Sequence, residues 1–155
     1  MSKLVFQFDA DLVGFPGVRR TIAVRSGQTL LDLHDALQAA FEWDDDHLYS
    51  FWLSGEFWES DGSEYTHPFH AALPDPLGVF ATGPAPKSAD VRLDRLRLAK
   101  GQRIAYVFDF GDEWRVLLRL SAITADDGRA YPVLRESAGD APPQYPEYDT
   151  EEDAA

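Results

Sequence analysis

Alternating hydrophobic and polar positions predict a pair of strands at the start of the chain. The segment KLVFQFDAD, residues 3–11, places every second large apolar side chain on one face, as in a half-buried strand. The segment GFPG that follows is rich in turn-forming residues. Residues 18–27 then form a second predicted strand, with Ile22 and Val24 facing inward. The two strands are predicted to pair as a hairpin.

The hydrophobic spacing changes to a helical period after this hairpin. One face of the predicted helix collects five apolar positions, which are Leu30, Leu33, Leu37, Ala40 and Phe41. Thr29 is the expected N-cap, and Asp32 completes a variant of the capping box. The pattern therefore predicts a helix over residues 30–41 that packs on the hairpin.

The rest of the chain predicts further strands around a long irregular segment. The expected elements are a strand pair within 47–65 that turns at Ser54-Gly55, a surface excursion over 66–90, a short helix over 91–98, and strands over 103–110, 113–123 and 131–136. The order ββα-ββ-(short helix)-βββ indicates an α+β fold, with one main helix on a mixed or antiparallel sheet. Its ββα opening resembles a β-grasp fold in order alone. We expect a single compact domain over 1–136 and a disordered, Pro-rich, acidic C-terminal tail over 137–155.

The tripeptide Asp109-Phe110-Gly111 has the letters of the magnesium-binding motif of protein kinases. A kinase is excluded because the chain has 155 residues and lacks the Gly-rich phosphate loop, the His-Arg-Asp catalytic loop and the Val-Ala-Ile-Lys strand. We instead expect a turn between two strands. Loops on rigid hairpins also carry function, so Asp109 and Asp112 remain candidate recognition groups at an exposed tip.

Side-chain parity predicts the length of this turn. A loop of odd length, Gly111 to Glu113, pairs Phe110 with Trp114 and keeps both apolar stripes on one side of the sheet. A slip of one residue would move one whole stripe out of the core.

The same register makes predictions for the polar residues of the turn. It places Asp109 opposite Arg115, a cross-strand charge pair that contributes about 0.2–1 kcal/mol. Gly111 is expected to supply a positive φ, and Asp112 to stabilise the loop.

Composition and charge narrow the classes of partner. The chain has 14 basic and 27 acidic residues, a net charge of −13, and residues 136–155 contain seven acidic residues and no Lys or Arg. Direct binding to nucleic acid is not expected, because phosphate backbones are bound by clustered basic residues. The acidic surface leaves open a nucleic-acid mimic. With no Cys and no long apolar run, we expect a cytoplasmic protein without membrane association.

Three segments carry a resemblance to a known family. The stretch YVFDFGDEWRV resembles the aromatic-Asp-Phe-Gly-Asp-x-Trp signature of the plasmid pRiA4b ORF-like family, and TLLDLHDALQAAFEWDDDHLYSF and YPVLRESAGDAPPQYP are similar to its other hallmarks. The resemblance spans roughly residues 3–146 and implies a compact α+β domain without an established activity. Its members are often labelled insertion-element passenger proteins of TnpR type, which implies a mobile-element association. The Tyr-x-Arg-x-Ser segment of serine resolvases is absent, so recombination is rejected.

Two sets of candidate functional residues follow. The candidate binding residues are Asp109, Gly111, Asp112, Trp114, Trp43 and Trp58. The candidate ligands of a divalent metal are His34, His47, Asp44 and Asp46, although their spacing matches no recognised ligand pattern. His34 also fits a hydrogen-bonded histidine at the buried face of the predicted helix.

The leading hypothesis is a non-enzymatic interaction module that binds a protein or peptide through the 47–65 strand pair and the Asp112 loop. It requires no cofactor. The alternatives are a metal-dependent enzyme that uses the histidine set, and the nucleic-acid mimic.

Overall fold

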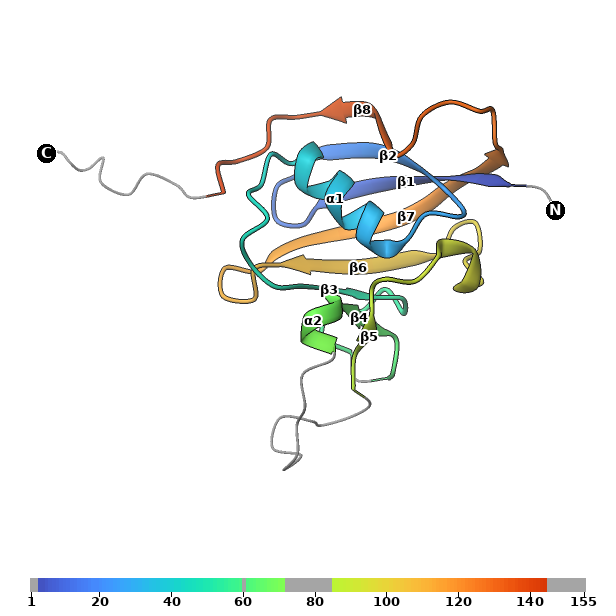
Figure 1. Cartoon of the computed structure of the whole chain (residues 1–155). Coiled ribbons are helices and arrows are strands. Elements are labelled where there is room, and N and C mark those ends of the chain that lie inside the picture. The colour runs from blue at the N-terminus through green and yellow to red at the C-terminus, as the bar shows by residue number, and fades with distance from the viewer. Residues whose placement is uncertain (1–2, 60, 72–84, 145–155) are drawn as a thin grey trace, which may run out of the picture.

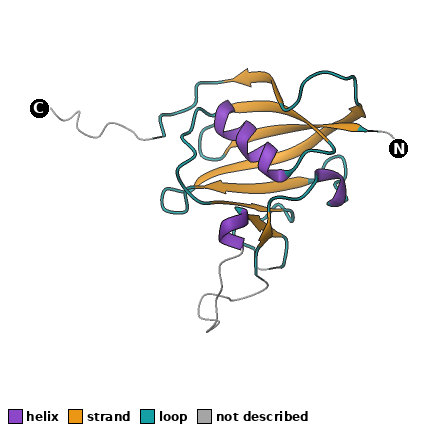
Figure 2. Cartoon of the chain, in the orientation of Figure 1, coloured by secondary structure: helices purple, strands orange, loops and turns teal. Residues whose placement is uncertain are grey.

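The computed structural model describes residues 3–59, 61–71 and 85–144. In this part of the chain the elements are β1 (Leu4–Leu12), β2 (Arg19–Arg25), α1 (Leu30–Ala40), β3 (Tyr49–Trp52), β4 (Glu64–Thr66), α2 (Pro68–Ala71), β5 (Lys87–Ser88), the 3-10 turn η1 (Leu93–Arg95), β6 (Arg103–Phe108), β7 (Trp114–Ala125) and β8 (Val133–Ala138). The strands form one sheet in the order β5-β4-β3-β6-β7-β1-β2-β8, in which β4 and β5 are parallel and the other neighbours antiparallel. The fold is α+β, and Figure 2 shows α1 lying across the strands.

Helix α1 confirms the predicted helix and its cap. The Oγ1 of Thr29 accepts a hydrogen bond from the amide of Asp32 at 3.2 Å, and the carboxylate of Asp32 accepts one from the amide of Thr29 at 2.9 Å. These reciprocal bonds satisfy donors that the helix start leaves unpaired. The helix ends one residue earlier than predicted, with Phe41 as its C-cap.

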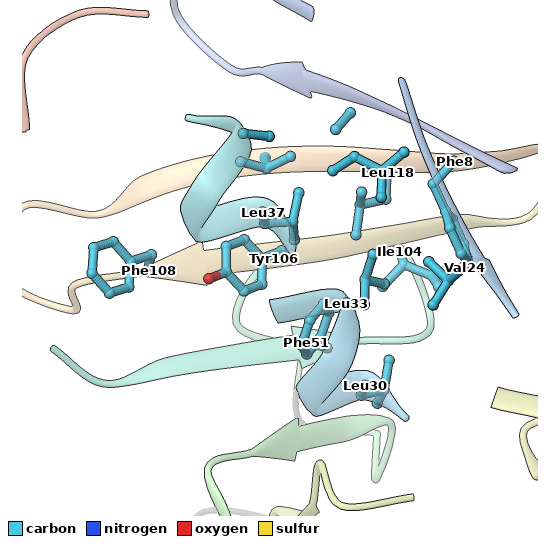
Figure 3. Packing of buried hydrophobic residues seen from close by; sticks show 14 of the residues in the cluster. Phe8, Val24, Leu30, Leu33, Leu37, Phe51, Ile104, Tyr106, Phe108 and Leu118 are labelled. Carbon is cyan, nitrogen blue, oxygen red and sulfur yellow. The ribbon is translucent and has the colours of Figure 1, made fainter. Parts of the chain in front are cut away.

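The main core lies between α1 and the sheet. Leu33 and Leu37 of α1 are fully buried, and Figure 3 shows them beside Ile104 and Tyr106 of β6. Phe8 of β1 reaches the same cluster. Because the core side chains come from strands far apart in the sequence, this layer joins both halves of the chain.

A second, smaller apolar cluster covers part of the opposite face of the sheet. Trp52, Ala105 and Val107 are buried there, with Phe57 and Phe110 packed against them. The predicted strand pair corresponds to β3 and β4, and the chain does turn at Ser54-Gly55, where the amide of Gly55 bonds the carbonyl of Trp52, but this turn alone does not connect the two strands. Strands β3 and β4 are joined across positions 53–63, and the aromatic side chains of this connection fold back over the sheet.

The register of the β6–β7 hairpin differs from the prediction by two residues. Phe108 pairs with Trp114, and Tyr106 pairs with Val116. The turn spans positions 109–113, so its length is odd as predicted and both apolar stripes face α1. The predicted pairing of Phe110 with Trp114 is wrong, because the strand ends before Phe110 and that side chain packs on the second cluster.

Other parts of the chain differ in detail from the predicted order. Helix α2 is a single helical turn inside the predicted excursion over 66–90, strand β5 was not predicted, and the predicted helix over 91–98 is reduced to η1. Strand β8 continues two residues past the predicted strand end at 136. Positions 72–84 of the predicted excursion and 145–155 of the predicted tail lie outside the described residues. Among the described helices, none has the length and apolar composition needed to cross a bilayer.

The buried contacts of α1 predict a large loss of stability on truncation. Leu33→Ala is expected to lower the free energy of unfolding by about 2–5 kcal/mol, because it leaves a cavity under a fully buried side chain. Leu48→Ala removes the same atoms from a side chain that is 45% exposed, and its cost should stay near about 0.5 kcal/mol. Urea denaturation of both variants measures the difference. Equal losses would contradict the described position of α1.

Candidate functional site

Four segments meet at one end of the sheet. They are the β1–β2 turn, the β6–β7 turn, the connection from α1 to β3 and the segment after β8, which Figure 1 shows gathered at the left. Backbone hydrogen bonds join them: Val13 donates to the carbonyl of Arg115 at 2.9 Å, and Asp109 donates to the carbonyl of Leu48 at 2.8 Å. The end of the sheet is thus built from segments distant in the sequence.

Asp109 organises the β6–β7 turn. Its φ is +66°, and its buried carboxylate accepts hydrogen bonds from the amides of Gly111 at 3.1 Å and Asp112 at 3.2 Å. Aspartate tolerates this left-handed conformation better than most residues because its short side chain bonds the local backbone. The positive φ predicted for Gly111 is wrong, since Asp109 and Glu113 adopt it instead.

The predicted pairing of Asp109 with Arg115 is also wrong. Arg115 lies opposite Val107 on the strands, and its guanidinium pairs with Glu113 at 2.7 Å. The histidine His47 lies beside Asp109 instead, with 3.4 Å between its Nε2 and the Oδ2 of the carboxylate. Asp109 therefore connects the turn to the α1–β3 connection.

A row of aromatic rings supports the same end of the sheet. Trp114 lies 5.8 Å, centroid to centroid, from both Phe15 and Trp43. Trp43 stacks in turn on Phe108 at 5.3 Å and on Phe41 at 4.9 Å. Trp43 is buried and packs against Trp114 on the side of the core. Its predicted role as a binding residue stays a prediction.

A groove of about 290 Å³ opens beside this row. Its lining residues are Val13, Phe15, Asp112, Glu113, Trp114, Arg115 and Gln144. Two of the predicted binding residues, Asp112 and Trp114, therefore line one groove. The β1–β2 turn and Gln144 were missed because nothing local in the sequence shows that they meet the β6–β7 turn.

Gln144 fixes one wall of the groove. Its side-chain amide accepts a hydrogen bond from the amide of Asp44 at 2.5 Å and donates to the carbonyl of the same residue at 3.2 Å. It also donates to the carboxylate of Asp46 at 3.2 Å. The described end of the chain is thereby tied to the α1–β3 connection.

Trp58, the remaining predicted binding residue, lies outside the residues that line the groove. Its ring packs against Trp52 and Phe110 of the second cluster and is 43% exposed. Its Nε1 donates a hydrogen bond to Glu113 at 3.1 Å. The 53–63 connection and the β6–β7 turn therefore brace each other.

His34 lies in a buried polar network on α1. Its Nδ1 is 2.7 Å from the hydroxyl of Tyr106, and its Nε2 is 3.0 Å from the Oδ1 of Asp45. The ring stacks on Tyr49 with 3.6 Å between centroids. Burial lowers the pKa of His34, while Asp45 opposes that effect.

The two histidines of the predicted metal set lie beside different carboxylates, and no described contact joins the carboxylate of Asp44 to either histidine. His34 meets Asp45, whereas His47 meets Asp46 and Asp109, each at 3.4 Å. Among the described residues, the group whose ligand atoms all lie within 4.8 Å of one another is His34, Asp35 and Asp45. The DDD run of the sequence pointed to this loop, but it could not show that its middle residue faces His34.

Comparison with known proteins places the chain in a family. The sequence model described as plasmid pRiA4b ORF-3-like protein matches residues 5–145. The chain belongs to this family. The segment 106–116, which carries part of the resemblance noted in the sequence, contains the turn that Asp109 organises.

Two relatives support the assignment to the plasmid pRiA4b ORF-3-like family. The chain is 27% identical over 129 residues to the uncharacterized protein y4hQ of Sinorhizobium fredii, covering 83% of this chain and 59% of that relative. It is also similar to the crystal structure of the protein of unknown function MM3350 from Methanosarcina mazei, with 26% identity and a TM-score of 0.70 over 93% of this chain and 74% of that one. The chain thus spans about three fifths of the length of y4hQ.

Substitution of Asp109 tests its place in the turn. Asp109→Ala is expected to lower the free energy of unfolding by about 1–3 kcal/mol, because two amides lose their acceptor and alanine disfavours the positive φ. Asp109→Asn keeps a side-chain oxygen and tolerates that conformation, so it should cost less. Denaturant unfolding compares them. An alanine variant as stable as the asparagine variant would contradict the described turn.

The buried His34 makes stability depend on pH. Its pKa in the folded chain lies below the ordinary value of about 6.5. Between these two values the unfolded chain binds more protons, so stability should fall as pH is lowered through about 6.5. Denaturation at about pH 7.5 and about pH 5.5 should show a smaller difference for His34→Gln than for the unaltered chain. The same difference in both proteins would contradict the desolvation of His34.

Proposed function

We propose that this chain is a binding module whose groove accepts an apolar side chain from a protein or peptide segment with basic flanking residues. The observation that carries the proposal is the groove itself, in which Phe15 and Trp114 provide an apolar surface beside the carboxylate of Asp112.

Exposed apolar side chains gather at this groove. Phe15 and Val13 both lie in the turn between β1 and β2. The side chain of Phe15 is 37% exposed and that of Val13 is 44% exposed. Apolar groups that line a concavity together are a common mark of a binding site. The volume of about 290 Å³ suits one large side chain and part of the adjoining backbone.

The walls of the groove are held before any partner arrives. The carboxylate of Asp109 fixes the β6–β7 turn, and the side chain of Gln144 fixes the segment after β8. A site whose backbone is already ordered loses less conformational entropy on binding. This favours recognition by a formed surface.

Charge selects the flanking residues of the partner. The chain has a net charge of −13, and Asp112 is exposed at the rim. The nearby Glu113 and Arg115 already pair with each other at 2.7 Å, and Asp112 forms no ion pair with the described residues. Opposite charge on a partner would speed encounter and orient it.

The family description adds a biological setting to the proposal. Its reference to a plasmid open reading frame supports a role linked to mobile genetic elements, and the TnpR-type label remains a prediction. Direct nucleic-acid contact is not proposed, because acidic residues outnumber basic ones by 27 to 14.

A peptide array tests the proposed specificity. The full chain would be applied to peptides that carry a central Leu, Phe or Trp flanked by Lys and Arg, by neutral residues, or by Asp and Glu. We expect retention of the basic peptides and loss of retention as salt is raised, since exposed charges are screened. Equal retention of acidic peptides would contradict the charge argument.

Two matched variants locate the contact. Phe15→Ser removes an apolar side chain from the groove, and Leu48→Ser removes one of similar exposure outside its lining. We expect at least about a tenfold loss of affinity for the first variant alone. Equal binding by Phe15→Ser and the unaltered chain would reject the groove.

A further inference from the structure

Three potential metal ligands converge at the start of the α1–β3 connection. His34 and Asp35 are neighbours on α1, and Asp45 follows the helix. One ligand atom from each lies within 4.8 Å of the other two. His34 is buried, whereas both carboxylates are exposed. The group therefore combines a ring nitrogen of the buried His34 with carboxylate oxygens of Asp35 and Asp45, whose exposed side chains can change conformation.

The spacing suits coordination of a small ion. Zinc bonds nitrogen and oxygen ligands at about 2.0–2.2 Å, which places neighbouring ligand atoms about 3–3.5 Å apart. The Nε2 of His34 and the Oδ1 of Asp45 are 3.0 Å apart. Because Asp35 is exposed, its carboxylate can approach without disturbing the core.

The other side of the imidazole is held as metal-binding histidines usually are. Coordination through Nε2 requires the proton of His34 on Nδ1, which lies 2.7 Å from the oxygen of Tyr106. The stacked ring of Tyr49 fixes the plane of the imidazole. In the metal-free chain Nε2 carries the proton that is donated to Asp45, so binding of an ion replaces this hydrogen bond and leaves the imidazole proton on Nδ1, facing Tyr106.

The buried network also contains an unpartnered acceptor. Gln38 donates from its Nε2 to the hydroxyl oxygen of Tyr106 at 3.0 Å, while its Oε1 is buried and has no hydrogen-bond partner among the described residues. When Nδ1 of His34 donates to Tyr106, the tyrosine proton is free to point at Gln38. A half-turn of the Gln38 amide would then give Oε1 this donor and would move Nε2 to the place where Oε1 now has no partner.

Electrostatics favour a cation at the same point. One carboxylate oxygen of Asp35 lies within 4.8 Å of one carboxylate oxygen of Asp45, so two negative charges are close together. A bound cation would relieve the repulsion between the carboxylates.

We infer that His34, Asp35 and Asp45 bind one divalent first-row transition-metal ion, of which Zn²⁺ is the test case. A ligand set of one imidazole and two carboxylates suits this class, whereas Mg²⁺ and Ca²⁺ prefer all-oxygen sites. Three protein ligands leave a coordination position for water, as in catalytic zinc sites. The inference is independent of the groove.

Calorimetric titration of the chelator-treated full chain with Zn²⁺ tests the site. We expect one equivalent to bind, with Mg²⁺ at least about a hundredfold weaker. Asp35→Asn should weaken Zn²⁺ binding at least about tenfold. It leaves the hydrogen bond between His34 and Asp45 of the metal-free chain unchanged. Asp44→Asn makes the same chemical change at a nearby aspartate of the α1–β3 connection that lies outside the group, and it should leave the affinity for Zn²⁺ unchanged.

Two measurements distinguish Zn²⁺ binding at His34, Asp35 and Asp45 from unspecific binding of Zn²⁺ to acidic residues elsewhere on the surface. Zn²⁺ should raise the Tm of the unaltered chain and of Asp44→Asn by more than that of Asp35→Asn, while all three melt alike without metal. The ¹⁵N NMR signal of His34 Nε2 should shift on addition of Zn²⁺. Equal effects of the two substitutions, a shift confined to other histidines, or no stoichiometric binding would overturn the inference.

Discussion

At the end of β6 the chain reverses through Asp109, and much of the described architecture at this end of the sheet depends on that turn. Its backbone takes a φ of +66° while its carboxylate accepts two amide hydrogen bonds. The reversal sets Phe108 opposite Trp114, which keeps both apolar stripes under α1. The reversal also places Phe110 on the opposite face of the sheet, where its side chain packs against the cluster of Trp52, Ala105 and Val107. The turn at Asp109 thus places Phe108 and Trp114 on the face covered by α1 and Phe110 on the opposite face.

The α1–β3 connection links the groove to the histidine network. Its Asp44 backbone is held by Gln144 at the groove wall, and its Asp45 carboxylate reaches His34 on α1. The amide of Asp109 is bonded to the carbonyl of Leu48 at the end of the same connection. A short loop without regular structure is therefore fixed at several points, as expected where a scaffold positions functional groups.

The chain belongs to the plasmid pRiA4b ORF-3-like family and is similar to y4hQ and MM3350, which are themselves an uncharacterized protein and a protein of unknown function. The chemistry must consequently be argued from the sites. The groove offers apolar surface and negative charge, which suits recognition of another chain. The His34 group offers nitrogen and oxygen ligands, which suits a metal ion. The groove and the His34 group are proposed to bind different ligands, a peptide and a metal ion, and each can be tested without the other.

The sequence alone determined the features that depend on local periodicity. The capped helix after Thr29, the alternating strands and the odd length of the β6–β7 turn all follow from side-chain spacing, because a wrong period or parity would expose an apolar stripe. Tertiary structure decided the exact register, since β6 ends at Phe108 and the next amide, that of Asp109, bonds the carbonyl of Leu48 in a distant segment. It also selected Asp45 from three adjacent aspartates as the partner of His34, because the path of a loop is set by contacts with distant segments such as Gln144.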